Sequence, residues 1–175
     1  MRKPIRFKEF FLIYNKSGRF VFEIFINFNL DLKTVAKQIF VNLPVKDLNK
    51  TIQFFTKLGF KFNPKFTDKN AACMIIGKNI FAMLLVERFF KTFIPKKKIS
   101  NAKKNTEVLN ALSVESRKKV DQIIIKAIKA DGEEYRKAQD YGWMYGRAFE
   151  DINGHLWEIF YMDEKAMPEE MKKRK

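Results

Sequence analysis

Cysteine and histidine are almost missing from this sequence of 175 residues, which contains one of each, Cys73 and His155. A single cysteine excludes an intramolecular disulfide, so we expect a reducing, cytoplasmic compartment. Cys73 lies in the apolar stretch AACMIIG, which favours a small buried side chain over a nucleophile. Apolar residues make up 46% of the chain, which indicates a folded globular protein rather than a disordered one.

Long uninterrupted apolar runs are also missing. The start, MRKPIRFKEFFLIY, is basic and then apolar, but the apolar run is too short for a signal peptide and no small-residue cleavage site follows it. The next apolar stretch, FVFEIFINFNL, is interrupted by Glu23, Asn27 and Asn29. These interruptions exclude a membrane span. The sequence therefore predicts no membrane partner.

Acidic residues do not balance the basic ones, and the formal net charge is +15. The stretch KTFIPKKKISNAKK (91–104) contains six lysines and no acid, and the tail MKKRK adds four basic residues. Without these two segments, residues 35–175 carry 18 basic and 17 acidic residues, a charge of +1. The excess is therefore local and typical of a solvated loop and tail. No nucleic-acid motif accompanies it, so we expect no specific nucleic-acid partner.

Periodicity predicts a repeat with the order β-α-β-β-β, present twice at an offset of 69 residues. Asp47 and Ser116 are equivalent in the two copies, and both are suited to cap a helix N-terminus. The predicted strands lie at 38–45, 60–64, 71–77 and 80–87 and at 107–114, 133–139, 143–150 and 155–162, and the helices at 47–60 and 116–132. A short helix and a basic loop separate the copies.

Two stretches resemble one known family. FVNLPVKDLNKTIQFFTKLGF resembles the opening of the first module in the vicinal oxygen chelate superfamily, which contains glyoxalase I, bleomycin-resistance proteins and extradiol dioxygenases. RAFEDINGHLWEIFYMD resembles the closing hairpin of that family. The resemblance implies an α+β fold in which two βαβββ modules form a paired, curved mixed β-sheet with helices outside.

The resemblance divides the chain into three parts. The domain is expected at 35–163, with module one at about 37–87, the basic insertion at about 88–105 and module two at about 106–163. Residues 1–34 form an N-terminal extension of unassigned role, and residues 164–175 form a basic tail. One hypothesis for the extension is that translation starts at Val35 and that the annotated start is wrong.

Metal-dependent members of the family place four ligands on the inner faces of the two modules. By resemblance these positions fall on Phe40, Leu84, Leu109 and Glu158, and three of them are apolar. Divalent ions require several N, O or S donors at fixed distances. We therefore predict no metal ligands and no cofactor. His155 does not compensate, because it lies three positions from Glu158 and side chains alternate along a strand.

The role of Glu158 stays open between three alternatives: a pair with Arg147 that fixes the hairpin, a group that holds or deprotonates a small ligand, or an exposed side chain. His155 is interpreted as a hairpin residue that packs or forms hydrogen bonds, against a role in proton transfer. Glu158 is the candidate catalytic residue. The candidate ligand-binding residues, each of which has core packing as its alternative where it is apolar, are Phe40, Asn42, Leu84, Leu109, Trp143, Tyr145, Arg147 and Phe160.

The resemblance implies a metal-free protein that binds a small molecule between its modules or at the seam of a homodimer. The alternative is an enzyme of the lyase, isomerase or dioxygenase class that uses Glu158, with or without a divalent metal. In that case Tyr145 or Arg147 would stabilise an oxyanion.

Overall fold

The computed structural model describes residues 36–172. The predicted N-terminal extension lies outside these residues, together with the hypothesis of a start at Val35 and the last three residues of the basic tail. Within residues 36–172, no helix is long and apolar enough to cross a membrane.

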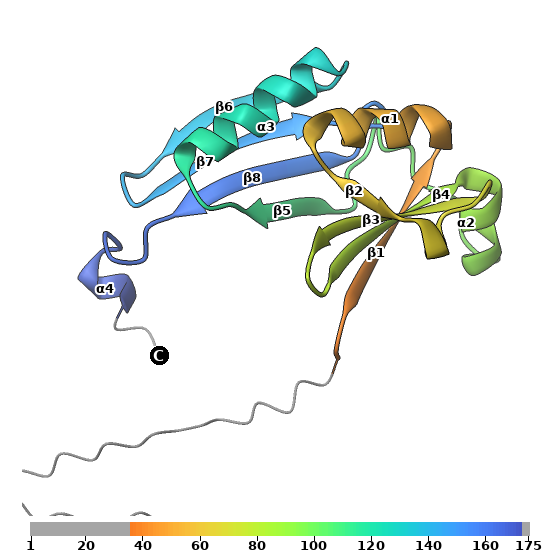
Figure 1. Ribbon diagram of the computed structural model, residues 1–175, viewed down its shortest axis with the longest axis horizontal. Helices are drawn as coiled ribbons and strands as arrows, with labels where there is room; N and C mark the ends of the chain where they lie inside the picture. The colour runs from red at the N-terminus through yellow and green to blue at the C-terminus, as the bar shows by residue number, and fades with distance from the viewer. Residues whose placement is uncertain (1–35, 173–175) are drawn as a thin grey trace, which may run out of the picture. The chain divides into compact units, whose positions relative to one another are not determined.

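The described chain forms two modules with the same order of elements, as the repeat predicts (Figure 1). The first module contains β1 (Ile39–Val45), α1 (Leu48–Leu58), β2 (Lys61–Asn63), the short helix η1 (Pro64–Phe66), β3 (Ala71–Gly77) and β4 (Ile80–Val86). The second module contains β5 (Leu109–Ser113), α3 (Arg117–Lys129), β6 (Glu133–Asp140), β7 (Met144–Glu150) and β8 (Leu156–Met162). Helix α2 (Glu87–Phe93) follows β4, and α4 (Glu169–Lys172) follows the second module. The expected α+β architecture is confirmed.

Each module has its own four-stranded mixed sheet. The strand orders are β1-β4-β3-β2 and β5-β8-β7-β6, so the first strand of each module lies at one edge of its sheet, beside the last strand. That pairing is parallel, while the other neighbours in each sheet are antiparallel. The hydrogen-bonded ladders stay within the modules. The two sheets are therefore joined by packing between the modules rather than by strand pairing.

The helix boundaries follow from the predicted capping residues. The Asp47 carboxylate accepts a hydrogen bond from the Lys50 backbone N–H (3.0 Å), and the Ser116 hydroxyl accepts one from the Lys119 N–H (3.1 Å). Each bond satisfies a donor at a helix N-terminus that has no partner within the helix. Gly59 ends α1 in the left-handed conformation, with φ of 105°. Such a conformation favours glycine because it has no Cβ.

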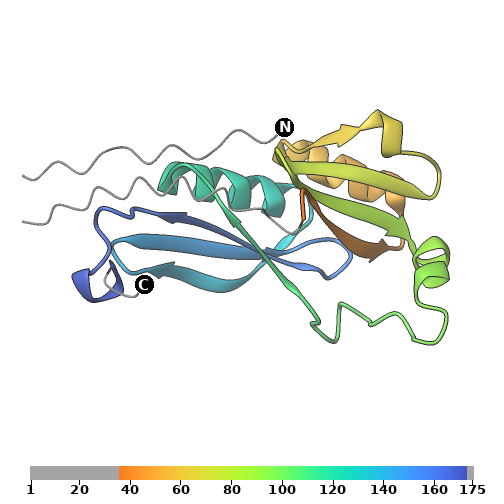
Figure 2. The same cartoon turned by 90° about the horizontal axis from the view of Figure 1, so that it is seen from below.

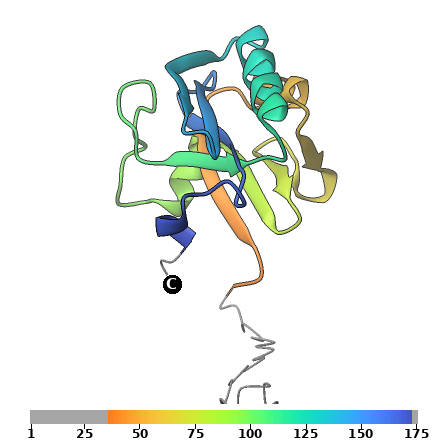
Figure 3. The same cartoon turned by 90° about the vertical axis from the view of Figure 1, so that its left-hand side faces the viewer.

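Helices α1 and α3 lie side by side and connect the modules (Figures 1 and 3). Phe54 and Phe55 of α1 contact aromatic residues of the second module. The Phe55 ring lies 5.3 Å from that of Trp157, and the Phe54 ring lies 6.2 Å from that of Phe149. All four side chains are at most 2% exposed. The helices and the sheet faces beneath them thus enclose one core that belongs to both modules.

Candidate functional site

Each sheet has one face covered by a helix and one open face, because successive side chains on a strand point to opposite sides. On the first sheet, Phe40 and Asn42 lie on the open face, and the Phe40 ring stacks on Phe81 at 4.8 Å. On the second sheet, Leu109 and Phe160 lie on the open face. Phe40 and Leu109 are 44% and 45% exposed. These two apolar faces are the surfaces on which a family ligand is expected.

The structure corrects the position expected for Leu84. Its backbone partner on β1 is Leu43, and both side chains belong to the core beneath α1. Leu84 is 0% exposed, so it cannot contact a ligand on the open face. Trp143 lies just before β7 and is half-buried, and its carbonyl oxygen accepts a hydrogen bond from the Asp163 N–H (2.8 Å). Its role in ligand binding stays a prediction.

Glu158 lies on the open face of the second sheet and is paired with Arg136 of β6. Ala148 lies between these two residues in the ladder, and its small side chain lets the longer ones meet above it. The Arg136 guanidinium also donates from Nη1 to the Gln139 side-chain oxygen (3.0 Å). Its buried Nε has no hydrogen-bond partner within the described residues. The open face therefore carries a fixed ion pair with one N–H left to satisfy.

The alternative in which Glu158 pairs with Arg147 is wrong. Arg147 lies on the helix-covered side of the sheet, where it binds Glu134 through two hydrogen bonds of 2.8 Å. It also donates to Asp121 (2.8 Å), and the Tyr145 hydroxyl donates to the same carboxylate (2.8 Å). Tyr145 and Arg147 thus point away from Glu158. They bind α3 to the sheet, and neither can stabilise an oxyanion beside Glu158.

This cluster on the helix-covered side shifts the pKa values of its members. Burial raises the pKa of Tyr145, and its hydrogen bond to Asp121 raises it further. Partial burial works to raise the pKa of Asp121, but the hydrogen bonds from Arg147 and Tyr145 outweigh it and lower that pKa. The hydrogen bonds to Glu134 raise the pKa of Arg147. All three groups therefore favour their ordinary charge states at neutral pH, as expected for a structural network.

The residues around Glu158 do not fit a divalent cation. Within residues 36–172, no three His, Cys, Asp or Glu side chains come together. The neighbour of Glu158 on β5 is Ala111, and its neighbour on β7 is Ala148, so neither adjacent strand supplies a donor atom. The Arg136 guanidinium already neutralises the carboxylate and would repel a second cation.

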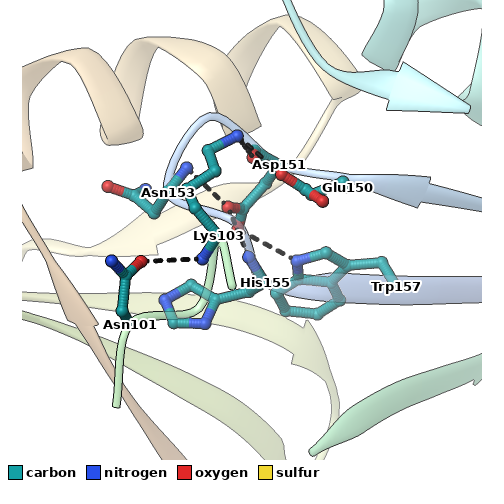
Figure 4. A network of polar contacts seen from close by, with 7 residues as sticks. All are labelled: Asn101, Lys103, Glu150, Asp151, Asn153, His155 and Trp157. Carbon is teal, nitrogen blue, oxygen red and sulfur yellow. Dashed lines mark hydrogen bonds and ion pairs between the residues drawn. The ribbon is translucent and has the colours of Figure 1, made fainter. Parts of the chain in front are cut away.

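The turn between β7 and β8 fixes the contact between the modules (Figure 4). Asp151, which is 1% exposed, accepts hydrogen bonds from the backbone N–H of Asn153 (2.8 Å) and from the Trp157 ring N–H (3.0 Å). Burial raises the pKa of Asp151, although His155 and these donors act against the rise. His155 Nε2 lies 2.8 Å from the carbonyl oxygen of Pro44 on β1. The prediction that His155 is a packed, hydrogen-bonded hairpin residue is confirmed.

The basic insertion lies against this turn (Figure 4). Lys103 Nζ pairs with Glu150 at 2.6 Å, and the backbone at Ala102 and Lys103 approaches Gly154. A Cβ on Gly154 would lie 2.6 Å from the backbone nitrogen of Lys103. Figure 2 shows the connection from α2 looping out before it reaches β5. The expectation of a freely solvated loop is therefore incomplete, because part of the insertion is fixed to the second module.

A cavity of about 290 Å³ lies where the insertion, α2, β1 and this turn meet. Asn42 is the member of the predicted ligand-binding set that lines it. His155 and side chains of the insertion also line it, and sequence reasoning did not connect them with a binding site. A second, shallow depression lies on β6 and β7. Arg136 lines it from the open face of the sheet, and Tyr145 lines it from the helix-covered face.

Comparison with known proteins agrees with this geometry. The family model described as bleomycin resistance protein-like N-terminal matches residues 37–77. A glyoxalase/bleomycin resistance protein/dioxygenase family enzyme from Burkholderia phytofirmans is similar over 73% of this chain and 100% of its own, with a TM-score of 0.63 and 14% identity. The fold is that of this glyoxalase/bleomycin resistance protein/dioxygenase family enzyme. The predicted resemblance is confirmed by the family model over part of the first module and by the fold over both modules.

Two other solved structures share this fold. A hypothetical protein from S. aureus is 28% identical over 76% of this chain and 99% of its own, with a TM-score of 0.61. The fosfomycin resistance protein FosX from Listeria monocytogenes is 14% identical over 75% of this chain and 98% of its own, with a TM-score of 0.55. No curated protein matches the sequence significantly. The shared fold thus fixes the scaffold, while the chemistry must be argued from the residues.

Proposed function

We propose that this protein binds a small molecule against its open sheet faces and uses no resident metal. The observation that carries the proposal is the Arg136–Glu158 pair, which occupies the second sheet where a metal-dependent protein would need a cluster of donors. A fixed cation beside a fixed anion offers both hydrogen-bond donors and acceptors to a polar group.

The surroundings of this pair indicate the general chemistry of the ligand. Leu109 and Phe160 lie on the same face of the second sheet, and Phe40 is exposed on the first. Binding sites for small molecules are commonly apolar with a few converging polar groups. A ligand with an apolar body and one polar group that can face Arg136 and Glu158 suits this surface.

A second copy of the chain is the proposed cover for the open faces, in a cytoplasmic homodimer. Phe40, Ile75, Leu109 and Met162 are each between 37% and 45% exposed, and they lie on strands whose other face is buried. Apolar patches of this kind commonly mark interfaces.

Light scattering of the purified full chain should give the mass of two copies. Phe40→Glu should shift it to one copy, while Ile128→Glu on the outside of α3 should leave the dimer intact. A wild-type mass of one copy would contradict the homodimer.

The alternative proposal is an enzyme in which Glu158 accepts a proton from the bound molecule. The enzyme from Burkholderia phytofirmans, which shares the fold, keeps this alternative open. Arg136 rather than Tyr145 or Arg147 would then stabilise a developing anion, since it lies beside Glu158. The carboxylate would first have to leave its ion pair to accept a proton.

One experiment tests whether Glu158 belongs to a metal site. The protein is purified without chelator, its metal content is measured by mass spectrometry, and its melting temperature is recorded with added Zn²⁺ or Mn²⁺. A metal-free binder should contain less than stoichiometric metal and should gain no stability that depends on Glu158. Glu158→Gln tests this dependence, and Glu133→Gln on β6 is the matched control. Stoichiometric metal that Glu158→Gln abolishes and Glu133→Gln retains would contradict the metal-free proposal.

A further inference from the structure

The cavity between the modules differs in character from the open sheet faces. Asn42 and Pro44 line it from β1, and Phe90 and Ile94 line it from α2 and the following residue. The second module contributes His155 and its neighbours in the turn. The cavity therefore forms only when both modules and the insertion are in place. Its volume, about 290 Å³, is close to the lower end of the range for sites that hold small organic molecules.

Two lysines of the insertion give the cavity a positive character. Lys97 and Lys98 line it, and neither forms an ion pair within residues 36–172. Lys103 of the same insertion differs, because it is neutralised by Glu150 at 2.6 Å. Glu107 is the acidic side chain in the lining, so the two lysines leave an excess of one positive charge. An anion at this position would be attracted by a charge that the protein itself does not compensate.

His155 adds a polar group with a defined orientation. A carbonyl oxygen only accepts, so the 2.8 Å contact with Pro44 requires that the ring N–H is on Nε2. Nδ1 of the neutral ring then carries a lone pair, and it forms no hydrogen bond with any described residue. His155 is 8% exposed and lines the cavity. The ring can thus accept a hydrogen bond from a ligand that carries a donor.

The remaining wall is largely apolar. Phe90, Ile94, Ile99, Val108 and Leu156 supply it. A strongly hydrated inorganic ion would leave these side chains without contacts, whereas an amphipathic molecule would cover them. The apolar wall and the two lysines without ion pairs therefore favour an amphipathic anion over a bare inorganic ion.

We propose that this inter-module cavity binds a small amphipathic carboxylate, with its apolar part between α2 and the insertion and its carboxylate beside Lys97 and Lys98. The site is separate from the Arg136–Glu158 pair on the open face of the second sheet. The insertion is then a ligand-binding element rather than a solvated connection. The inference does not depend on the function proposed for the open faces.

The single histidine makes the test direct, because the full-length protein has one imidazole signal in an NMR spectrum. Octanoate is titrated into the labelled protein at low salt, and octanamide is its uncharged counterpart. Octanoate should shift the His155 signal in a saturable manner, and octanamide should bind more weakly by about fivefold or more, because it cannot pair with the lysines. Lys97→Gln/Lys98→Gln should weaken octanoate binding by a similar factor.

Lys126→Gln/Lys129→Gln on α3 is the matched control, since it removes the same charge outside the cavity, and it should change the affinity by less than about twofold. All variants are first checked for an unchanged melting temperature. The proposal is overturned if octanoate at millimolar concentration leaves the His155 signal unmoved, or if both double variants weaken binding equally. It is also overturned if Arg136→Met abolishes binding while Lys97→Gln/Lys98→Gln retains it, because the ligand would then lie on the open face.

Discussion

At the scale of single residues, the pair between Arg136 and Glu158 is the charged feature of the open face. Arg136→Met should lower the free energy of unfolding by about 1 kcal/mol, because it leaves a half-buried carboxylate without its partner. The side chains are 31% and 22% exposed, so solvent screens part of their attraction. A double-mutant cycle with Glu158→Gln, measured by urea denaturation, should give a coupling of about 0.5–1 kcal/mol. Purely additive effects would contradict a direct pair.

A second ion pair at this scale predicts a dependence on pH. Hydrogen bonds from Arg117 and from the Gly142 backbone lower the pKa of Asp140 from 3.8 to about 2. A carboxylate with a lowered pKa in the folded state stabilises the protein above its unfolded pKa, and this contribution is lost as the pH falls through the folded pKa. Asp140→Asn should therefore lower the urea midpoint at pH 7, and the difference from wild type should shrink between pH 3.8 and about 2. A difference independent of pH would contradict this assignment.

The residue scale also shows where sequence reasoning reached its limit. Alternation correctly separated His155 from Glu158, since His155 contacts Pro44 of β1 while Glu158 pairs with Arg136. The partner of Glu158 was missed because the register between β6 and β7 shifts on both sides of Arg136. Beyond such an irregularity, alternation along β6 no longer predicts on which face of the sheet a side chain lies. Leu84 was misplaced for a simpler reason: every residue of β4 is apolar (IFAMLLV), so its sequence has no polar alternation from which the orientation of Leu84 can be read.

At the scale of elements, the turn from Asp151 to His155 connects the second module to the insertion. Gly154 has φ of +97°, and a Cβ would also lie 2.7 Å from the carbonyl carbon of Ala102. Gly154→Ala should therefore destabilise the protein by about 2 kcal/mol or more, from backbone strain and from displacement of the insertion. Gly142→Ala is the matched control, because Gly142 has φ of +77° and nothing lies within 4 Å of its Cβ. It should cost about 1 kcal/mol, from strain alone.

Thermal unfolding of both glycine variants measures this difference. Equal losses would show that the insertion does not press against the turn.

The strands and helices themselves were predictable from sequence, because caps such as Asp47 and Ser116 and the apolar periodicity are local signals. The position of the insertion was not predictable, since it depends on contacts such as Lys103–Glu150 between residues distant in sequence.

At the scale of the whole described chain, the modules share one core although their sheets are separate. The sequence repeat predicted two modules, and each contributes a helix and the covered face of its sheet to the same apolar cluster. A module alone would expose the aromatic residues that contact the other. The cavity between the modules depends on the same contact, because its walls come from both. Stability and the proposed carboxylate site are therefore linked.

This shared core predicts that the two modules unfold together. Phe55 is 0% exposed and lies in edge-to-face contact with Trp157 of the second module at 5.3 Å. Phe55→Ala should lower the free energy of unfolding by about 3–5 kcal/mol, and Phe93→Ala, which is 64% exposed on α2, by less than about 0.5 kcal/mol. Hydrogen exchange should show faster opening of β7 and β8 as well as of β3 and β4 in Phe55→Ala, because removal of one ring weakens both sides of the interface. Faster exchange confined to the first module would mean that the second is stable without it, and the modules would then be independent folding units.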